Sequence, residues 1–244
     1  MKVLLHGNNA KNIAGLIQSL GFEIVTENPD VVISYGGDGT LLSSEKKYPG
    51  VPKLPIRDSL ICKKCLNHED KVILKKLLEK ELQLKEYKKL HTSVYGKALL
   101  ALNDFVVRNK EPIHTIRFKT LQDDTPGEIY IGDGIVVSTP FGSTGYFKSI
   151  TGESFSDGFA LAFNNTTKKT APIYLNQDEY DKADGFDKIG FQLVRGKATL
   201  TFDNSPDVFS ISEGTTLEFK LSDQVAKIYE DTSLRCPNCK VIRG

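Results

Sequence analysis

The sequence predicts two domains of different class, an N-terminal α/β domain followed by a larger all-β domain. Two observations carry this prediction. Up to about Lys80, short apolar strands alternate with helical patterns, which is typical of a parallel sheet with crossover helices. From about Leu82 onward, short β-type segments separated by turn residues replace that alternation, which indicates a sandwich.

The N-terminal segment has the order strand, helix, strand, strand. The expected elements are strands at 2–6, 22–26 and 31–35 and helices at 10–20, 41–45 and 70–80. The run Val31–Ser34 is apolar without alternation, as expected of a strand covered on both faces in a parallel sheet. Residues 49–58 hold three prolines, so we expect a loop or an edge strand there.

The all-β part is predicted from segments that recur between turns. These segments are 99–107, 115–119, 128–137, 190–193, 198–202 and 216–221. The tail from Val225 to Gly244 is too short to form a domain and must dock elsewhere. We therefore assign residues 1–81 together with 226–244 to the α/β domain and residues 82–225 to the β-sandwich domain.

Composition excludes several classes of function. The 244 residues include 39% hydrophobic and 26% charged residues, which is ordinary for a globular protein, and the net charge is +1. This balance gives no excess of positive charge that would bind nucleic acid or an anionic membrane. No apolar run approaches the roughly 20 residues of a membrane helix, and the N-terminus is too briefly apolar for a signal peptide. We expect a cytoplasmic protein.

A glycine-rich turn follows the buried strand at 31–35. Its sequence is Gly36-Gly37-Asp38-Gly39-Thr40, and a helical segment follows. Glycines let a ligand approach the backbone, and exposed amides at a helix start bind phosphate oxygens. A carboxylate in such a cradle needs a task, such as orienting a hydroxyl, accepting its proton or helping to hold Mg²⁺. The alternative is a plain turn with an aspartate cap.

This turn indicates a phosphotransferase without naming the substrate, because diacylglycerol and sphingosine kinases share it with NAD kinases. A second block decides between them. Gly132–Tyr146 closely resembles the hallmark segment of NAD kinases, and Asn103-Asp104 resembles that family's Asn-acidic pair. The resemblance implies an N-terminal domain of the Rossmann-like, phosphofructokinase and diacylglycerol kinase type. It also implies a C-terminal β-sandwich, with the chain's tail returning to the first domain and the active site between the two.

The resemblance also implies the binding residues. The residues that it places against NAD are Asn103, Asp104, Thr144, Gly145, Tyr146 and Ser149, while Gly36, Gly37, Gly39 and Thr40 form the phosphate turn. It further implies homodimers or homotetramers in which Asp133 reaches a neighbour's NAD site. The chemistry agrees, since an amide suits an adenosine edge and a carboxylate can accept both hydroxyls of a ribose. Taken alone, Tyr146 would more simply be a core aromatic.

The reaction implied is transfer of a phosphoryl group from ATP, or from another donor such as polyphosphate, to the 2′-hydroxyl of the adenosine ribose of NAD. Mg²⁺ would neutralise the donor phosphates, and Asp38 would orient the hydroxyl and accept its proton. Two alternatives remain. One is a lipid or sugar kinase with the same turn; the other is an inactive nucleotide-binding regulator, suggested by the altered segment after Ser149.

Besides the altered segment after Ser149, four positions depart from the family pattern. Phe141, Gly145 and Asp104 stand where the family usually has Thr, Ala and Glu, and Asp203-Asn204 stands where an Asp-Gly turn is common. These changes bear on substrate details, including the preference for NAD over NADH.

The four cysteines form two C-x-x-C pairs. Cys62 with Cys65 and Cys236 with Cys239 have the ligand number and spacing of a structural zinc site, which would clamp the tail to the first domain. Two disulfides or four reduced thiols are the alternatives. Resemblance does not support the metal, because NAD kinases do not usually carry it.

Overall fold

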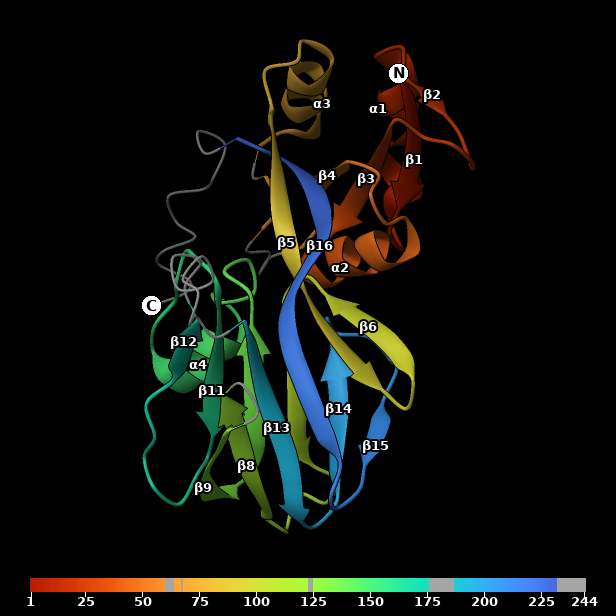
Figure 1. Cartoon of the computed structure of the whole chain (residues 1–244). Coiled ribbons are helices and arrows are strands. Elements are labelled where there is room, and N and C mark those ends of the chain that lie inside the picture. Colours follow the sequence, from red (N-terminus) through yellow and green to blue (C-terminus); the bar gives the residue numbers. More distant parts are fainter. Residues whose placement is uncertain (60–63, 67, 123–124, 176–186, 232–244) are drawn as a thin grey trace. The chain divides into compact units, whose positions relative to one another are not determined.

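The computed structural model describes residues 1–59, 64–66, 68–122, 125–175 and 187–231. The chain divides into two compact units. Unit 1 contains residues 1–87 and 225–244, and unit 2 contains residues 88–224. Two long strands, β5 (Gln83–Val94) and β16 (Thr216–Glu230), carry the chain from one unit to the other (Figure 1). The α/β class of the first unit and the β-sandwich class of the second confirm the prediction.

Unit 1 is built on a parallel sheet. Its strands are β1 (Lys2–His6), β2 (Glu23–Ile24), β3 (Val31–Gly36) and β4 (Lys53–Arg57), in the order β2-β1-β3-β4. The end of β16 joins β4 in parallel, with Ile228 opposite Lys53. The last described part of the chain therefore returns to the N-terminal unit, as the resemblance implied.

Helices flank this sheet. They are a 3-10 turn at Ala10–Ile13, α1 (Ala14–Ser19), α2 (Asp38–Lys47) and α3 (Asp70–Leu78). The helix expected at 10–20 is thus divided into a tight turn and a short α-helix. Apolar side chains from the helices and strands share one core, which includes Ile17, Ile33 and Leu74. All three are fully buried, so the sheet and its helices form a single packed layer structure.

The prediction for residues 49–58 was wrong in part. Residues 53–57 form β4, which pairs along its whole length with β3, from Val32 opposite Lys53 to Gly36 opposite Arg57. On its other side β4 meets β16 only at Lys53. Pro55 has no amide proton, so it cannot donate a hydrogen bond to a neighbouring strand. It is tolerated in β4 because the side that faces β16 makes few strand-to-strand hydrogen bonds.

Unit 2 is a sandwich of antiparallel strands. One sheet has the order β12-β11-β10-β7-β14-β15. The other sheet has the order β9-β8-β13-β16 and uses the first part of β16. The β5–β6 hairpin extends this second sheet, because β5 pairs with β16. The bounds are β6 Lys97–Ala101, β7 Asp104–Asn109, β8 Ile116–Gln122, β9 Thr125–Gly132, β10 Gly134–Ser138, α4 Tyr146–Thr151, β11 Phe159–Asn164, β12 Ile173–Leu175, β13 Lys188–Arg195, β14 Ala198–Phe202 and β15 Phe209–Ile211.

The core of unit 2 lies between its two sheets. Phe105 of β7 and Phe219 of β16 belong to opposite sheets, and their ring centroids are 5.6 Å apart. Both side chains are fully buried. The two inner faces therefore interdigitate as expected of a sandwich, and this packed core holds the loops at its ends in fixed positions.

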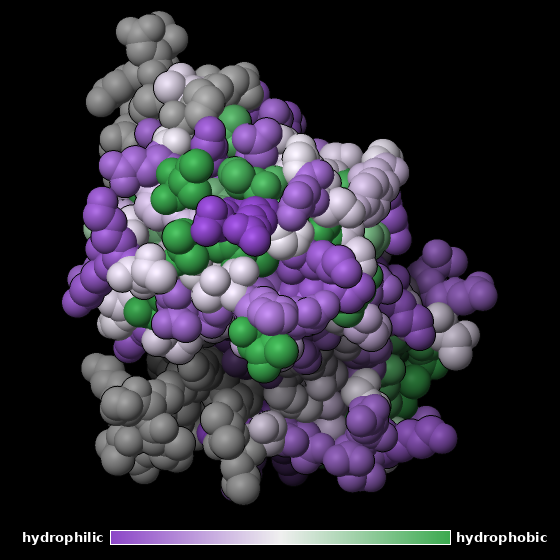
Figure 2. Space-filling view, turned by 90° about the horizontal axis from the view of Figure 1, so that it is seen from below, coloured by the Kyte–Doolittle hydropathy of each residue, from purple (hydrophilic) through white to green (hydrophobic). Residues whose placement is uncertain are grey.

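The surface seen in Figure 2 is mostly hydrophilic, with apolar residues in separate small groups. Among the described residues, no helix has the length and apolar character needed to cross a membrane.

Candidate active site

The glycine-rich turn joins β3 to α2. Gly36 ends the strand, Gly37 occupies the position before the helix, and Asp38 is its first residue. A Cβ on Gly36 would lie 2.2 Å from Oγ1 of Thr40, so only glycine fits there. The backbone amides at the start of this ten-residue helix are the groups that bind phosphate oxygens in such turns.

Asp38 is half-buried, and its carboxylate is oriented by a neighbouring segment. Oδ1 accepts a hydrogen bond from the Lys64 amide at 3.0 Å. The same segment holds the turn itself, because the Asp58 amide donates to the Gly36 carbonyl at 3.0 Å and Cys65 Sγ lies 3.6 Å from that oxygen. The residues after β4 therefore fix both the backbone of the turn and its one acidic side chain.

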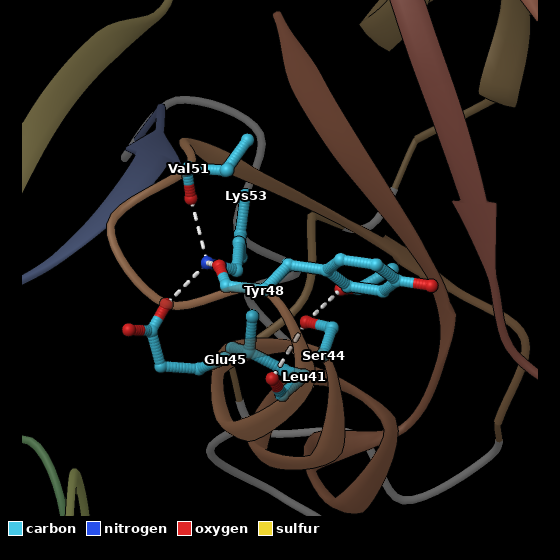
Figure 3. Close-up of polar contacts among 7 residues, drawn as sticks. Leu41, Ser44, Glu45, Tyr48, Val51 and Lys53 are labelled. Carbon is cyan, nitrogen blue, oxygen red and sulfur yellow. Dashed lines mark hydrogen bonds and ion pairs between the residues drawn. The ribbon is translucent and has the colours of Figure 1, made fainter. Parts of the chain in front are cut away.

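A buried ion pair anchors the other end of α2 (Figure 3). Lys53 at the start of β4 pairs with Glu45 of the helix, and the ammonium group also donates to the carbonyl oxygens of Tyr48 at 2.5 Å and Val51 at 2.6 Å. The two side chains are 0% and 4% exposed. This pair ties the helix that carries Asp38 to the sheet beneath it.

A polar cavity of about 530 Å³ lies beside the turn. It is lined by Leu5, His6, Gly7, Asn8, Gly39, Thr40, Ser43, Lys47 and Tyr48. His6 Nε2 lies 2.7 Å from Ser43 Oγ. Burial lowers the pKa of His6 below its usual value, and the nearby Lys47 cation lowers it further. The cavity thus offers a cation, hydroxyls and an imidazole of lowered pKa next to the glycine-rich turn.

In unit 2, one carboxylate organises the segment that contains Asn103 and Asp104. Asp203 Oδ2 accepts from the Leu102 amide at 2.5 Å, and Oδ1 accepts from the amides of Asn103 at 2.6 Å and Asp104 at 3.3 Å. Asp203 and Asn204 have φ of 47° and 54°, a left-handed conformation that Asp and Asn tolerate better than most residues. The turn after β14 therefore sets the backbone of the predicted NAD-binding pair.

The loop after β10 packs directly on this pair. A Cβ on Gly142 would lie 2.1 Å from the Asn103 carbonyl oxygen, so the two backbones are in contact. Thr139 Oγ1 donates to the Leu102 carbonyl at 2.6 Å and accepts from the Gly142 amide at 3.0 Å. These contacts bring Asn103 and Asp104 together with the segment that leads into α4.

The remaining predicted NAD contacts lie at the start of α4. Gly145 precedes the helix, Thr144 and Ser149 are exposed, and Ser149 Oγ donates to the Tyr146 carbonyl at 2.7 Å. Tyr146 is 37% exposed, and its hydroxyl accepts from Asn164 Nδ2 at 3.0 Å. Its ring is therefore at the surface of unit 2, and the alternative of a core aromatic is not what the structure shows.

Asp133 lies at the opposite end of β10 from the loop at Gly142. Its Oδ2 accepts from Asn165 Nδ2 at 3.0 Å, and its Oδ1 lies 3.5 Å from Asn109 Nδ2. Its amide donates to the Asn164 carbonyl at 3.0 Å, so Asn164 connects Asp133 to Tyr146. Within one chain, Asp133 and Asn103 therefore lie at opposite ends of the β10–β7 pair.

The predicted residues thus form one group in each unit, with 36–40 in unit 1 and the NAD-contact set in unit 2. Sequence reasoning gave no role to Asp203, His6 or Lys47. An Asp-Asn pair after an apolar strand signals a turn, but nothing local shows which amides its carboxylate will bind. His6 and Lys47 become relevant only because β1 and α2 are neighbours of one cavity.

The metal hypotheses concern four cysteines and Asp38. Cys62, Cys236 and Cys239 lie outside the described residues, while Cys65 is described and buried. In the described part of the chain, no three His, Cys, Asp or Glu side chains are grouped to hold a metal ion. Mg²⁺ in nucleotide sites is held mainly by phosphates and waters with one or two carboxylates, so Asp38 fits that requirement.

Comparison with known proteins supports one family. No protein-family model matches the chain. NAD kinase 2 of Bacillus subtilis is 26% identical over 241 residues, covering 89% of this chain and 85% of that protein. The fold matches an Archaeoglobus fulgidus NAD kinase solved with ATP, with a TM-score of 0.81, 22% identity and full coverage of both chains. Yeast NADH kinase, solved with NADH, has a TM-score of 0.74 and 14% identity, covering 91% of this chain and 69% of that one.

Three observations agree. The sequence blocks stand in the family's order, the relatives align over most of the chain, and the two-unit fold is shared. This chain is therefore similar to NAD kinases in its sequence blocks, over most of its length and in its fold.

Proposed function

We propose that this protein transfers a phosphoryl group from ATP, or from another donor such as polyphosphate, to the 2′-hydroxyl of the adenosine ribose of NAD, giving NADP for NADP biosynthesis. One observation carries the proposal. The same chain holds a carboxylate, Asp38, at the first position of a glycine-capped helix, and an Asn103–Tyr146 group organised by Asp203. The relatives named as NAD kinases support this reading.

The donor phosphates are placed at the start of α2. Gly39 and Thr40, at the start of this helix, line a cavity that also contains Lys47 and His6. A cation and helix-start amides together stabilise phosphate oxygens. Mg²⁺, when bound with the donor, would add charge neutralisation, and we reserve the Asp38 carboxylate for the acceptor hydroxyl.

The acceptor is placed in unit 2. Asn103 can donate to and accept from an adenosine edge, and the Asp104 carboxylate can accept from ribose hydroxyls. Tyr146 presents an exposed ring on which adenine can stack, while Asn164 holds its hydroxyl. Thr144 and Ser149 add hydroxyl groups at the start of α4. Because Asp203 fixes three successive amides of this segment, the contacts are formed before the substrate arrives.

In the transfer step, the ribose 2′-oxygen bonds to the terminal phosphorus of the donor while the bond to the bridging oxygen breaks. ADP leaves with the electron pair of that bond, and the hydroxyl proton passes to the Asp38 carboxylate. Such transition states are loose, so positioning and charge stabilisation dominate the rate. A positioned proton acceptor contributes roughly 10²–10⁴ in rate.

Assembly completes the proposal. We place Asp133 at the NAD site of a neighbouring copy in a homodimer or homotetramer. The Asp133 carboxylate is half-exposed, so a ligand of another chain can reach it. Asn165 and Asn109 orient the carboxylate. Equilibrium sedimentation measures the assembly. An Asp133→Asn variant that keeps its assembly and loses NAD affinity supports this role, and unchanged affinity contradicts it.

A structural zinc ion is the last component. We place it on Cys62, Cys65, Cys236 and Cys239, which would join the C-terminal tail to the segment that contacts Gly36 through Cys65. Elemental analysis of the purified protein tests this: one zinc per chain supports it, and a metal-free protein with four titratable thiols overturns it.

The activity is tested by incubating the protein with NAD, ATP and Mg²⁺ and measuring NADP. The matched variant is Asp38→Asn, because an amide oxygen can still accept from the Lys64 amide and keeps the turn intact. We expect NAD binding to persist while turnover falls by about 10² or more. Binding of NAD without product would favour an inactive regulator, and neither binding nor product would favour a lipid or sugar kinase.

A further inference from the structure

A cavity of about 560 Å³ opens in unit 2 near the turn from β13 into β14. In Figure 1 this turn is at the lower end of the sandwich, on the side from which Figure 2 is seen. The proposed NAD contacts do not line it. Its volume is in the range of pockets for small-molecule ligands.

Two arginines face each other across the strands that border this cavity. Arg117 of β8 lies directly opposite Arg195 of β13, because a bulge shifts the register between Leu193 and Arg195. The neighbouring pair, Phe118 and Leu193, is buried in the core, so the arginine pair is on the outer face. Like charges in such positions repel each other and destabilise a sheet.

Within the described residues, these cations form no ion pairs. Arg117, Arg195 and the nearby Lys197 are exposed, and in the part of the chain that the structure describes none of them takes part in an ion pair. Of the residues that the structure describes, Glu111 is the one acidic residue that lines the cavity, and its Oε2 lies 3.7 Å from His114 Nε2. The lining therefore carries an excess of positive charge.

The cavity wall is built into the fold. Gly196 has φ of 104° and packs on Ile116, since a Cβ there would lie 3.1 Å from Ile116 Cγ2. Its amide donates to Glu213 Oε1 at 2.7 Å, and the Lys110 amide donates to the Lys197 carbonyl at 2.9 Å. The cationic turn is thus held in place before any ligand binds, which lowers the entropic cost of binding.

An apolar surface adjoins the charged one. Ile131 of β9 is the cross-strand partner of Arg117. Arg195, Arg117 and Ile131 therefore form a row across the three strands β13, β8 and β9. Ile113 also lines the cavity and is 85% exposed. A ligand that fits both parts carries an anionic group and an apolar portion.

We propose that this cavity binds a phosphate-bearing small molecule, with Arg117 and Arg195 on the phosphate and Ile113 and Ile131 against the rest. Two planar guanidinium groups on adjacent strands match the oxygens of one phosphate group, to which each can donate two hydrogen bonds. The phosphate can belong to an inorganic chain or to a nucleotide. The site uses only residues of unit 2 outside the proposed NAD contacts, so it does not depend on the proposed activity.

The test is calorimetric titration with pyrophosphate and, separately, with NADP. Each is combined with amide hydrogen exchange to locate the binding. We expect protection of segments 110–117 and 195–197. Arg117→Gln and Arg195→Gln should each weaken binding at this site about tenfold or more, as loss of a charged hydrogen bond implies. Arg108→Gln is the matched control, because Arg108 is exposed in the same unit and does not line the cavity.

The two ligands separate the two sources. Protection by pyrophosphate assigns the site to free phosphate chains, and protection by NADP alone assigns it to a nucleotide. Protection confined to segment 36–48, or equal affinities for the Arg117→Gln and Arg108→Gln variants, overturns the proposal. If the protein makes no NADP but ligand binding still protects segments 110–117 and 195–197, the proposed activity is refuted and the cavity proposal stands.

Discussion

Lys53 and Glu45 form an ion pair in the interior of unit 1, where their side chains are 0% and 4% exposed. The lysine carries its charge beside two backbone carbonyl oxygens of the loop that follows α2. Removing charges from water is costly, so each member of the pair depends on the other. The pair is therefore a sensitive point for the stability of the helix that begins at Asp38.

We expect Lys53→Met to lower the free energy of unfolding of unit 1 by about 3–5 kcal/mol, because Glu45 would be left as a buried charge without its partner. Replacing both residues, as Lys53→Met with Glu45→Leu, should recover most of that loss. Urea denaturation followed by circular dichroism measures both variants. A loss below about 1 kcal/mol in the single variant would show that water reaches the site.

The stability of unit 1 should depend on pH through His6. Burial lowers the pKa of His6 from 6.5, and Lys47 adds to the shift. The unfolded chain then binds more protons than the folded one, so this contribution to stability is complete above pH 6.5 and is lost as the pH falls toward the folded pKa. Denaturation at several pH values measures the slope, which should disappear in His6→Gln.

The same histidine should couple donor binding to protons. A phosphate group in the cavity beside His6 favours the charged imidazole and raises its pKa. ATP should therefore bind more tightly as the pH falls below neutrality, with uptake of a proton. Calorimetry in two buffers of different ionisation enthalpy measures that uptake, and an ATP affinity independent of pH in the native protein contradicts it.

Two glycines of one loop offer a matched comparison. Gly142→Ala would put a Cβ 2.1 Å from the Asn103 carbonyl oxygen, whereas Gly145→Ala would put one 3.1 Å from the Gly142 carbonyl oxygen. We expect the first change to weaken NAD binding about tenfold or more, because the backbone of Asn103 must move. The second should be close to neutral. Equal KM values for NAD would show that the contact has no bearing on the substrate.

Asp203 should act on NAD through Asn103 and Asp104. Asp203→Ala removes the acceptor of three amides and should lower stability by about 1–3 kcal/mol while raising the KM for NAD. Asp203→Asn keeps a residue that tolerates the left-handed turn and retains one acceptor, so its effect should be smaller. A KM that stays constant in both variants would limit Asp203 to a structural role, and steady-state kinetics decides.

Much of the fold could be predicted because its signals are local. The first strand was expected at 2–6, where β1 lies, and the unalternating run at Val31 indicated the parallel sheet that the structure contains. By contrast, β5 was missed. Most residues in the first half of β5 are exposed, so this half lacks the alternation of apolar and polar residues that predicts a strand.

The parts that could not be predicted depend on contacts between distant segments. Motif order identified the turn at Asp38 and the group at Asn103, but the carboxylate of Asp203 meets its amides only after β7 and β14 have paired. Likewise, Arg117 and Arg195 become partners only through a bulge in β13. Neither relationship has a signature in the residues next to it.

The pairing of Ile228 with Lys53 has a consequence for biosynthesis. A growing chain emerges from the ribosome with β1 to β4 first, yet the strand that covers the start of β4 is made only after the whole of unit 2. Unit 2 is continuous in sequence, so it has its own strands available earlier. The N-terminal segment therefore lacks this strand until unit 2 has been made, and an unpaired strand edge is prone to misassembly during that interval.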